Sequence, residues 1–182
     1  MADASHLNSI QIRPVNLSDA KDLLSIYAPY VETSYITFET EVPTLNQYQE
    51  RIQKITSRFP WFVAEENGIV VGFAYATVFR ERAAYSWALE SSIYVKDSHQ
   101  GAGSRCARLL YEALFATLRK SGIKQVIGVI SLPNEKSVRF HEKLGFRTVG
   151  TFPSVGFKLG KWWDVLFMTK LLEDLPFSEP MI

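Results

Sequence analysis

The chain has 182 residues, of which 47% are hydrophobic and 21% are charged, and its formal net charge is +1. This length suits one domain with a sizeable core, and the balanced charge points neither to nucleic acid nor to a membrane surface as a partner. No apolar run approaches the roughly 20 residues that span a bilayer, and the first residues, MADASHLNS, lack the features of a signal peptide. We therefore expect a soluble, cytoplasmic protein.

The first predicted elements are a short strand and a helix. Apolar and polar residues alternate in IQIRPV, residues 10–15, and Pro14 indicates an edge position or the end of the strand. Ser18 is a candidate N-cap for a helix over residues 19–33. Pro29 should kink or shorten that helix, because proline lacks the N–H that the helix interior needs.

A second helix is predicted after an irregular segment. Thr44 followed by Gln47 is a capping-box pattern, and the helix that it starts should run to about Phe59. In the irregular residues 34–42, Phe38 is either an anchor of the loop or a wall of a substrate site. The loop comes too early in the chain for phosphate contacts in most α/β folds, so a substrate role is the more specific of the two interpretations.

The middle of the chain predicts an antiparallel meander. Asn67–Gly68 between two apolar runs is a two-residue hairpin turn, which pairs residues 61–65 with residues 69–79. Gly72 indicates a bulge or close packing, and residues 85–95 form a third long strand. A dinucleotide-binding domain would instead alternate parallel strands with helices, so this order of elements disfavours it.

Glu90 is the notable charge of the third strand. It lies in the largely uncharged segment ALESSIYV, where burial would raise the pKa of a carboxylate as a general base requires. The alternative is a glutamate that faces water at the sheet edge. Arg80 and Arg82 lie in the turn before this strand, and either could bind a carboxylate through a bidentate guanidinium or be a solvated loop charge.

The stretch after this strand combines a turn, glycines and a helix. Gly101 and Gly103 precede a helix over residues 103–121, which Gly122 ends. Free N–H groups at a helix N-terminus favour an anion, so the pattern predicts either a phosphate site or an ordinary turn. One side of the helix carries apolar residues at helical spacing, namely Leu109, Leu110, Leu114 and Leu118.

The last third predicts a buried strand, a helix and two more strands. The apolar run at residues 125–130 suits a strand added parallel to its neighbour through the preceding helix. Asn134 can cap a helix over residues 135–144, and strands follow at residues 146–152 and 164–171.

Two remaining side chains have reactive groups. His141 lies on the helix at residues 135–144, where a single histidine is more often structural or exposed than catalytic. Cys106 is the only cysteine, which excludes an internal disulfide, and no histidine neighbours it, so it is a buried small residue rather than a nucleophile. No cluster has metal-ligand spacing, and we expect no metal.

Together, these elements and motifs resemble the GCN5-related N-acetyltransferase (GNAT) superfamily over residues 10–172. The resemblance rests on the order of elements, on YV-x(4)-Q-G-x-G, and on N-x(6)-H-E-K-L-G-F. It implies an α+β fold, with a mixed, mostly antiparallel twisted sheet flanked by helices, in a single domain with tails at residues 1–9 and 173–182. The phosphate motif Gln/Arg-x-x-Gly-x-Gly/Ala is matched from Gln100, except that Arg105 replaces its last small residue.

Several further blocks look like the phosphinothricin and methionine sulfone/sulfoximine acetyltransferases. They are TFETEVPT, ALESSIYV, VISLPNEKSVRFHEKLGF and VGFKLGKWWDV. The resemblance implies that acetyl is transferred from acetyl-CoA to the α-amino group of a small amino-acid-like substrate, without a metal, in an enzyme that is a homodimer. Glu90 matches the proposed general base, and His141 stands where most of the superfamily has a tyrosine that protonates the leaving thiolate.

The resemblance also assigns binding residues. Backbone groups of Ile93, Tyr94 and Val95 would bind the pantetheine arm, and Asn134 and Lys143 would contact the rest of coenzyme A. The pyrophosphate would be held by Gln100, Gly101, Ala102, Gly103, Ser104, Arg105 and Cys106. The amino-acid pocket would comprise Phe38, Arg82, Ala83, Ala84 and Tyr85.

Two alternative functions stay open at this point. Acetylation of a protein N-terminus or lysine would need an open, charged groove, whereas the aromatic and arginine residues suit a closed small pocket. A non-catalytic acyl-CoA-binding module is favoured by Arg105 and disfavoured by the presence of both Glu90 and His141.

Overall fold

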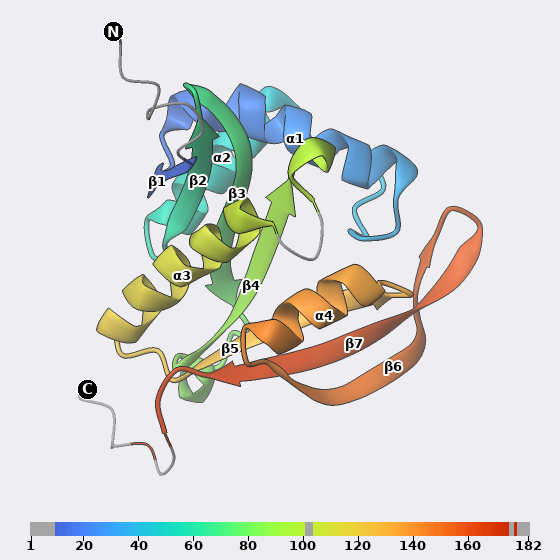
Figure 1. Cartoon of the computed structure of the whole chain (residues 1–182). Helices are drawn as coiled ribbons and strands as arrows, with labels where there is room; N and C mark the ends of the chain where they lie inside the picture. Colours follow the sequence, from blue (N-terminus) through green and yellow to red (C-terminus); the bar gives the residue numbers. More distant parts are fainter. Residues whose placement is uncertain (1–9, 101–103, 175–176, 178–182) are drawn as a thin grey trace, which may run out of the picture.

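The computed structural model describes residues 10–100, 104–174 and 177, and its centre is a seven-stranded twisted sheet (Figure 1). The strand order is β1-β2-β3-β4-β5-β7-β6, and β4 and β5 are the parallel pair of neighbours, whereas all the other pairs are antiparallel. This confirms the mixed, mostly antiparallel sheet. The strands are β1 (Ile10–Pro14), β2 (Trp61–Glu66), β3 (Ile69–Val78), β4 (Ala88–Val95), β5 (Gln125–Leu132), β6 (Arg147–Lys158) and β7 (Lys161–Leu171).

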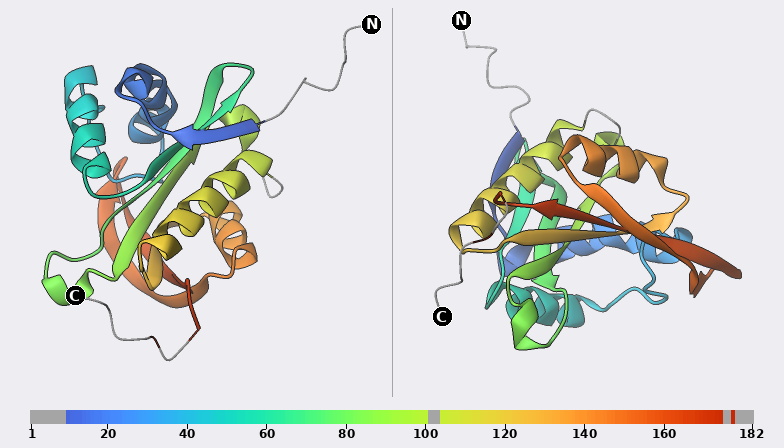
Figure 2. Two further views of the ribbon diagram at one scale, coloured as in Figure 1. Left: turned by 90° about the vertical axis from the view of Figure 1, so that its left-hand side faces the viewer. Right: turned by 90° about the horizontal axis from the view of Figure 1, so that it is seen from below.

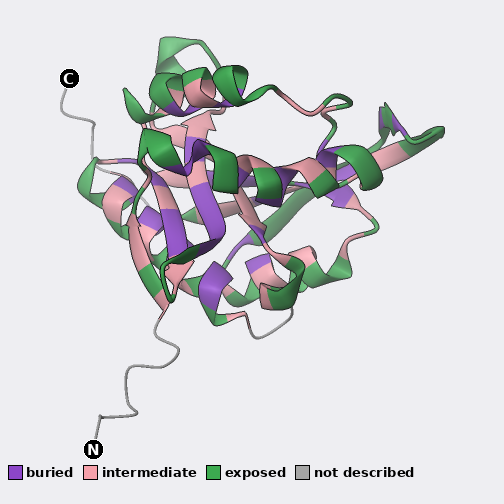
Figure 3. Cartoon of the chain, turned by 90° about the horizontal axis from the view of Figure 1, so that it is seen from above, coloured by how far each residue is buried: buried purple, intermediate pink, exposed green. Residues whose placement is uncertain are grey.

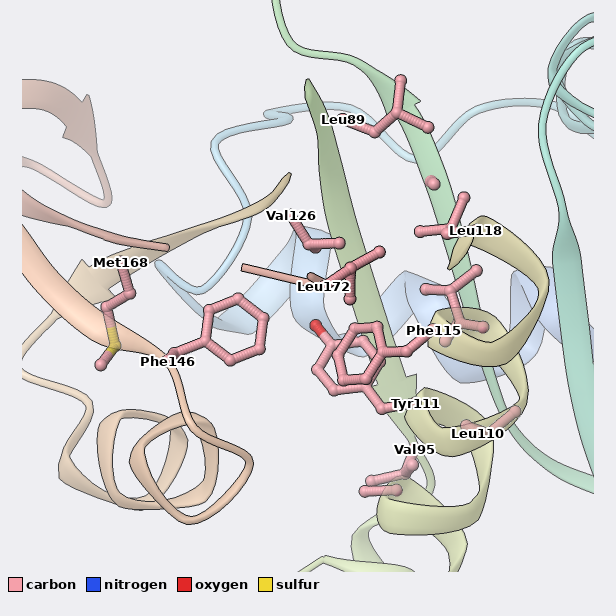
Figure 4. Packing of buried hydrophobic residues seen from close by; sticks show 14 of the residues in the cluster. Leu89, Val95, Leu110, Tyr111, Phe115, Leu118, Val126, Phe146, Met168 and Leu172 are labelled. Carbon is pink, nitrogen blue, oxygen red and sulfur yellow. The ribbon is translucent and has the colours of Figure 1, made fainter. Parts of the chain in front are cut away.

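Helices cover both faces of the sheet (Figure 2). α1 (Ala20–Thr33) and α2 (Leu45–Thr56) lie on one face, and α3 (Arg105–Lys120) and α4 (Glu135–Lys143) lie on the other. Each side has its own core, and the buried positions follow the strands and the inner helix faces (Figure 3). On the α3 side, Tyr111 packs among Leu110, Phe115 and Phe146 (Figure 4).

The local signals in the sequence explain most of these elements. The capping box is confirmed, since the Gln47 N–H donates to Thr44 Oγ1 at 3.3 Å and the Thr44 N–H donates to Gln47 Oε1 at 2.8 Å. Asn134 caps α4 by accepting the Ser137 N–H at 3.2 Å. A side chain at Gly72 would place its Cβ 2.7 Å from a Val95 methyl group, so close packing is confirmed there.

The helices differ from expectation at three positions. Ser18 lies inside a short 3-10 turn, Leu17–Asp19, and the residue that precedes α1 is Asp19. Of the two effects expected of Pro29, shortening does not occur, because α1 continues to the predicted end at Thr33. Leu109 is only partly buried, because the inner side of α3 is formed by Cys106, Ala107, Leu110, Tyr111, Leu114, Phe115 and Leu118.

Several strands differ from their predicted bounds: β5 ends at Leu132 rather than at residue 130, and β7 begins at Lys161 rather than at residue 164. β4 begins at Ala88 rather than at residue 85, because a 3-10 turn at Ala83–Tyr85 takes up the preceding backbone, with the Tyr85 N–H donating to the Arg82 carbonyl at 2.9 Å. β6 continues well past residue 152 to Lys158, and the β6–β7 hairpin extends away from the body of the molecule (Figure 1).

Candidate active site

β4 and β5 are paired over only half of their length. Their register runs from Ala88 opposite Gln125 to Ser91 opposite Gly128, and beyond that point the two strands no longer pair. β4 stays paired with β3 to its end, and β5 stays paired with β7. Each strand therefore has one edge with no neighbouring strand, and such an edge can accept an extended chain through its peptide groups.

A cavity of about 500 Å³, the central cleft, lies where β4 and β5 separate. Glu90 on β4, His141 on α4 and Phe38 in the loop after α1 all line it, together with three of the predicted cofactor residues, Ile93, Tyr94 and Asn134. The other lining residues come also from the turn after β3 and from α3, β5, β6 and β7, and include Thr37, Arg80, Ser91, Tyr111, Ser131, Phe152 and Val155.

Glu90 is half-buried in this cleft, opposite Thr77 of β3. Burial raises the pKa of its carboxyl group, and the positive charge of Arg80 partly offsets that effect. A carboxylate whose pKa is raised by desolvation is a stronger base than one in water. Glu90 is thus equipped to accept a proton from a substrate that enters the cleft.

His141 is 4% exposed, and both of its ring nitrogens have partners. Nδ1 lies 2.8 Å from the Ser137 carbonyl, which can only accept, so Nδ1 carries the proton. Nε2 is then free to accept the Tyr111 hydroxyl at 3.2 Å, and that hydroxyl lies 3.2 Å from Ser91 Oγ. Burial lowers the pKa of His141, which favours the neutral ring that this arrangement needs.

The sequence patterns did not single out Tyr111 or Ser91. Tyr111 falls at the same helical spacing as the leucines of α3, so its periodicity is that of a core residue. The available signal was its hydroxyl, since a buried tyrosine usually has a hydrogen-bond partner. That partner is a histidine 30 residues further along the chain, which no local pattern reveals.

The predicted amino-acid pocket is only partly assembled in the chain. Phe38 lines the central cleft, but Arg82, Ala83, Ala84 and Tyr85 do not, because the 3-10 turn carries them away from it. Arg80 lies in the cleft instead. Ala84 and Tyr85 line a separate cavity of about 290 Å³ beside Trp87, so a substrate role for residues 82–85 stays a prediction.

A further cavity of about 280 Å³, which we call the side channel, lies beside the unpaired edge of β4. Five predicted cofactor residues line it, namely Ile93, Val95, Gln100, Ser104 and Asn134. It shares Ile36, Ile93, Asn134 and Ser137 with the central cleft, so the two cavities adjoin. An unpaired strand edge that leads from a helix N-terminus into the cleft fits a long, phosphate-bearing chain such as coenzyme A.

Tyr30 and Lys136 also line the side channel, although the sequence did not point to them. The Tyr30 hydroxyl donates to the Val95 carbonyl at 2.7 Å and accepts from Gln100 Nε2 at 2.8 Å. Tyr30 therefore ties the end of β4 to the segment that begins the predicted phosphate loop.

The remaining predicted cofactor residues lie elsewhere. Gly101, Ala102 and Gly103 are outside the described residues. Tyr94 lines the central cleft rather than the side channel, and Arg105 and Lys143 are exposed. Cys106 is buried beside Gly72, and burial raises the pKa of its thiol to about 12, which suits the predicted structural role.

The described part of the chain has neither a metal-ligand cluster nor a membrane-spanning helix. Within it, no group of three or more His, Cys, Asp and Glu residues could hold a metal ion. Among the described helices, none is both long and apolar enough to cross a membrane.

Comparison with known proteins agrees with the fold. Residues 12–167 match the family model for an acetyltransferase (GNAT) domain. A phosphinothricin N-acetyltransferase of Streptomyces viridochromogenes is 39% identical over 164 residues, which cover 90% of this chain and 88% of that protein. An L-methionine sulfoximine/L-methionine sulfone acetyltransferase of Salmonella typhimurium is 32% identical over 164 residues, with 90% and 95% covered.

A solved structure is similar over nearly its whole length. It is the crystal structure of a GNAT superfamily phosphinothricin acetyltransferase from Sinorhizobium meliloti in complex with AcCoA, with a TM-score of 0.89 and 31% sequence identity. The similarity covers 96% of this chain and 94% of that one.

Proposed function

The chain belongs to the GNAT acetyltransferase family and is an acetyl-CoA-dependent N-acetyltransferase, and we propose that its acceptor is the α-amino group of a small amino acid or amino-acid analogue. Phosphinothricin and methionine sulfoximine are the leading candidates, because the relatives described above are named for acetylating these compounds. We also propose a cytoplasmic location, where acetyl-CoA is available to the enzyme.

The observation that carries this proposal is the meeting of Glu90 and His141 in one cleft. The two residues come from β4 and α4, 51 positions apart, and they face the same cavity at the point where β4 and β5 separate. A free amino acid is an ammonium ion near neutral pH and cannot attack a thioester until a base removes a proton. Glu90 supplies that base, and the side channel supplies a route for the thioester.

The mechanism follows from these residues. Glu90 takes a proton from the ammonium group, directly or through water, and the nitrogen lone pair then forms a bond to the thioester carbonyl carbon. Peptide N–H groups at the unpaired edge of β4 stabilise the negative charge that develops on the carbonyl oxygen. The adduct nitrogen still carries one surplus proton, and we assign its transfer to His141. Nε2 of the neutral ring takes this proton while the Tyr111 hydroxyl turns toward Ser91 Oγ, and gives it to the sulfur as the carbon–sulfur bond breaks.

Coenzyme A would be held along the side channel. Acetyl-CoA contributes the activated acetyl group, and Ile93 and Val95 would bind the pantetheine arm through their backbone groups. Ser104, the N-cap of α3, would lie near the phosphates, and its Oγ accepts the Ala107 N–H at 3.2 Å. Asn134 and Lys136 would contact the remainder of the molecule.

The test is thiol release from acetyl-CoA with a panel of amines. Phosphinothricin, methionine sulfoximine, methionine sulfone and ordinary amino acids should differ in kcat/KM, with at least one well above the rate without amine. A peptide with a free N-terminus, or a peptide with an internal lysine, should give no release above that background. Release with peptides alone would overturn the small-acceptor proposal, and no release with any amine would overturn the enzymatic role of the cleft.

The β6–β7 hairpin supports the proposal that the enzyme is a homodimer. β6 is an edge strand with β7 as its neighbour on one side, and an exposed apolar edge of this kind favours pairing with another chain. Six large apolar residues of the hairpin are each more than half exposed, namely Val149, Phe152, Val155, Phe157, Leu159 and Trp162. Because Phe152 and Val155 also line the central cleft, a second copy on this strand would lie beside the cleft.

Phe157→Asp is expected to convert the dimer into a monomer at micromolar concentration, because it places a charge within an apolar interface. Sedimentation velocity measures the change. Ile69→Asp is the matched control, since Ile69 and Phe157 are both 57% exposed but Ile69 lies in the distant β2–β3 hairpin. A wild-type protein that is monomeric at all concentrations would refute the dimer, as would a Phe157→Asp variant that stays dimeric.

A further inference from the structure

Lys158 is a buried lysine at the end of β6 that has no part in the mechanism described above. It is 4% exposed, and its Nζ donates to the Thr37 carbonyl at 2.8 Å and to the Tyr30 carbonyl at 3.3 Å. A buried ammonium group is costly unless its protons find acceptors, and here two backbone carbonyls serve. Both partners lie more than 120 residues away in the sequence, so the contact joins distant parts of the fold.

The Thr37 carbonyl belongs to the loop that forms one wall of the central cleft. Ile36, Thr37 and Phe38 all line that cleft, whereas Lys158 bonds to the Thr37 backbone without lining the cavity itself. The Thr37 side chain is held as well, with its Oγ1 2.8 Å from the Tyr27 hydroxyl. The position of Phe38 in the cleft therefore depends on a backbone segment that Lys158 anchors.

The same hairpin is shaped to fit this loop at two more points. The Trp163 ring stacks on Tyr35 at 3.9 Å between ring centres, and its Nε1 donates to the Lys158 carbonyl at 2.8 Å. At Gly156, an added Cβ would overlap the Phe38 ring, which leaves room only for glycine. The hairpin and the cleft wall are thus complementary around Lys158.

Lys158 is connected less directly to the residues of the side channel than to the loop after α1. Its contact with α1 is to the backbone carbonyl of Tyr30, whereas it is the Tyr30 hydroxyl that binds Val95 and Gln100. That carbonyl lies in the last turn of α1, but the Tyr30 side chain is held separately by its two hydroxyl bonds and by an edge contact with Tyr94. Loss of Lys158 should therefore disturb the loop after α1 more than the side channel.

We propose that Lys158 is a positioning residue for the amine substrate: it fixes residues 36–38 as a rigid wall of the central cleft and thereby sets the affinity for the amine. The inference rests on the proposed function, because it takes the central cleft to be the amine site. A wall that is already ordered binds more tightly, since less conformational entropy is lost when the substrate enters.

The test compares Lys158→Met with Lys161→Met, its control. Methionine keeps an unbranched, apolar stem and removes the ammonium group, and Lys161 lies in the same hairpin but is exposed. For Lys158→Met we expect KM for the amine to rise about tenfold, the equivalent of one charged hydrogen bond, with KM for acetyl-CoA within about twofold of wild type. Lys161→Met should match wild type in both constants.

A second variant covers the case in which Lys158→Met does not fold. Gly156→Ala keeps Lys158 but pushes the Phe38 ring out of place, so it should also raise KM for the amine and spare KM for acetyl-CoA. If both variants fold and leave KM for the amine unchanged, the inference is wrong. A rise in KM for acetyl-CoA alone would place the role of Lys158 at the cofactor and would also overturn it.

Hydrogen–deuterium exchange without substrates separates this inference from the proposed function. Amides of residues 34–39 should exchange faster in Lys158→Met than in wild type or Lys161→Met, with the side-channel strand unchanged. If wild type turns over no amine, the proposed function fails, and the exchange still decides whether Lys158 fixes the wall. If wild type is active and exchange at residues 34–39 does not change, only the role of Lys158 fails.

Discussion

Replacing Glu90 with glutamine is expected to lower kcat for amine acetylation by about 10²- to 10⁴-fold, the range for loss of a general base. Glutamine has nearly the same shape but cannot accept the ammonium proton. Steady-state thiol release measures the loss, and KM for acetyl-CoA should change little because Glu90 does not line the side channel. Glu112→Gln is the control, since Glu112 is exposed on α3; a Glu90→Gln variant that keeps the full rate would remove Glu90 as the base.

The pH dependence gives this prediction a second readout. Glu90 must be ionised to act, so the wild-type rate should fall as the pH drops through its pKa, which burial raises above the ordinary value for a glutamate. The acidic limb of the kcat/KM profile, which reports the free enzyme, should therefore lie at a higher pH than an exposed carboxylate would give. Glu90→Gln should lack that limb, and an unchanged limb in the variant would assign it to another group.

His141→Phe is expected to lower kcat by about 10²-fold, the lower range for loss of an acid–base group, and to leave KM for acetyl-CoA near wild type. Phenylalanine suits the site sterically because Phe140, Phe146 and Tyr111 surround the imidazole, but it cannot exchange a proton. Tyr111→Phe should cost less, since it removes the partner of Nε2 and keeps the imidazole. A His141→Phe variant with kcat within about threefold of wild type would exclude His141 from proton transfer.

The elements that the sequence predicted well are those with strong local signals. The Asn67–Gly68 turn has positive φ at both residues, which local chemistry alone favours, and it forms the β2–β3 hairpin. The capping box at Thr44 likewise needs only residues within one turn. β6 was harder to predict, because most of its residues are exposed and no alternation of buried and exposed positions marks its length.

The site shows the same division between local and distant causes. Glu90 was recognisable because it is a single carboxylate in an uncharged strand. The choice between Arg80 and Arg82 depended on how the turn folds, and only Arg80 lines the cleft. Tyr111 and Lys158 escaped notice because their partners, His141 and the Thr37 carbonyl, are brought near by the tertiary fold.

A crystal structure with acetyl-CoA tests the central claim most directly, namely that acetyl transfer takes place in the cleft between β4 and β5. We predict that the pantetheine arm hydrogen-bonds to the unpaired edge of β4 and that the thioester lies in the central cleft, between Glu90 and His141. The pyrophosphate should lie at the N-terminus of α3. Acetyl-CoA bound elsewhere, or with its thioester outside the central cleft, would contradict the account.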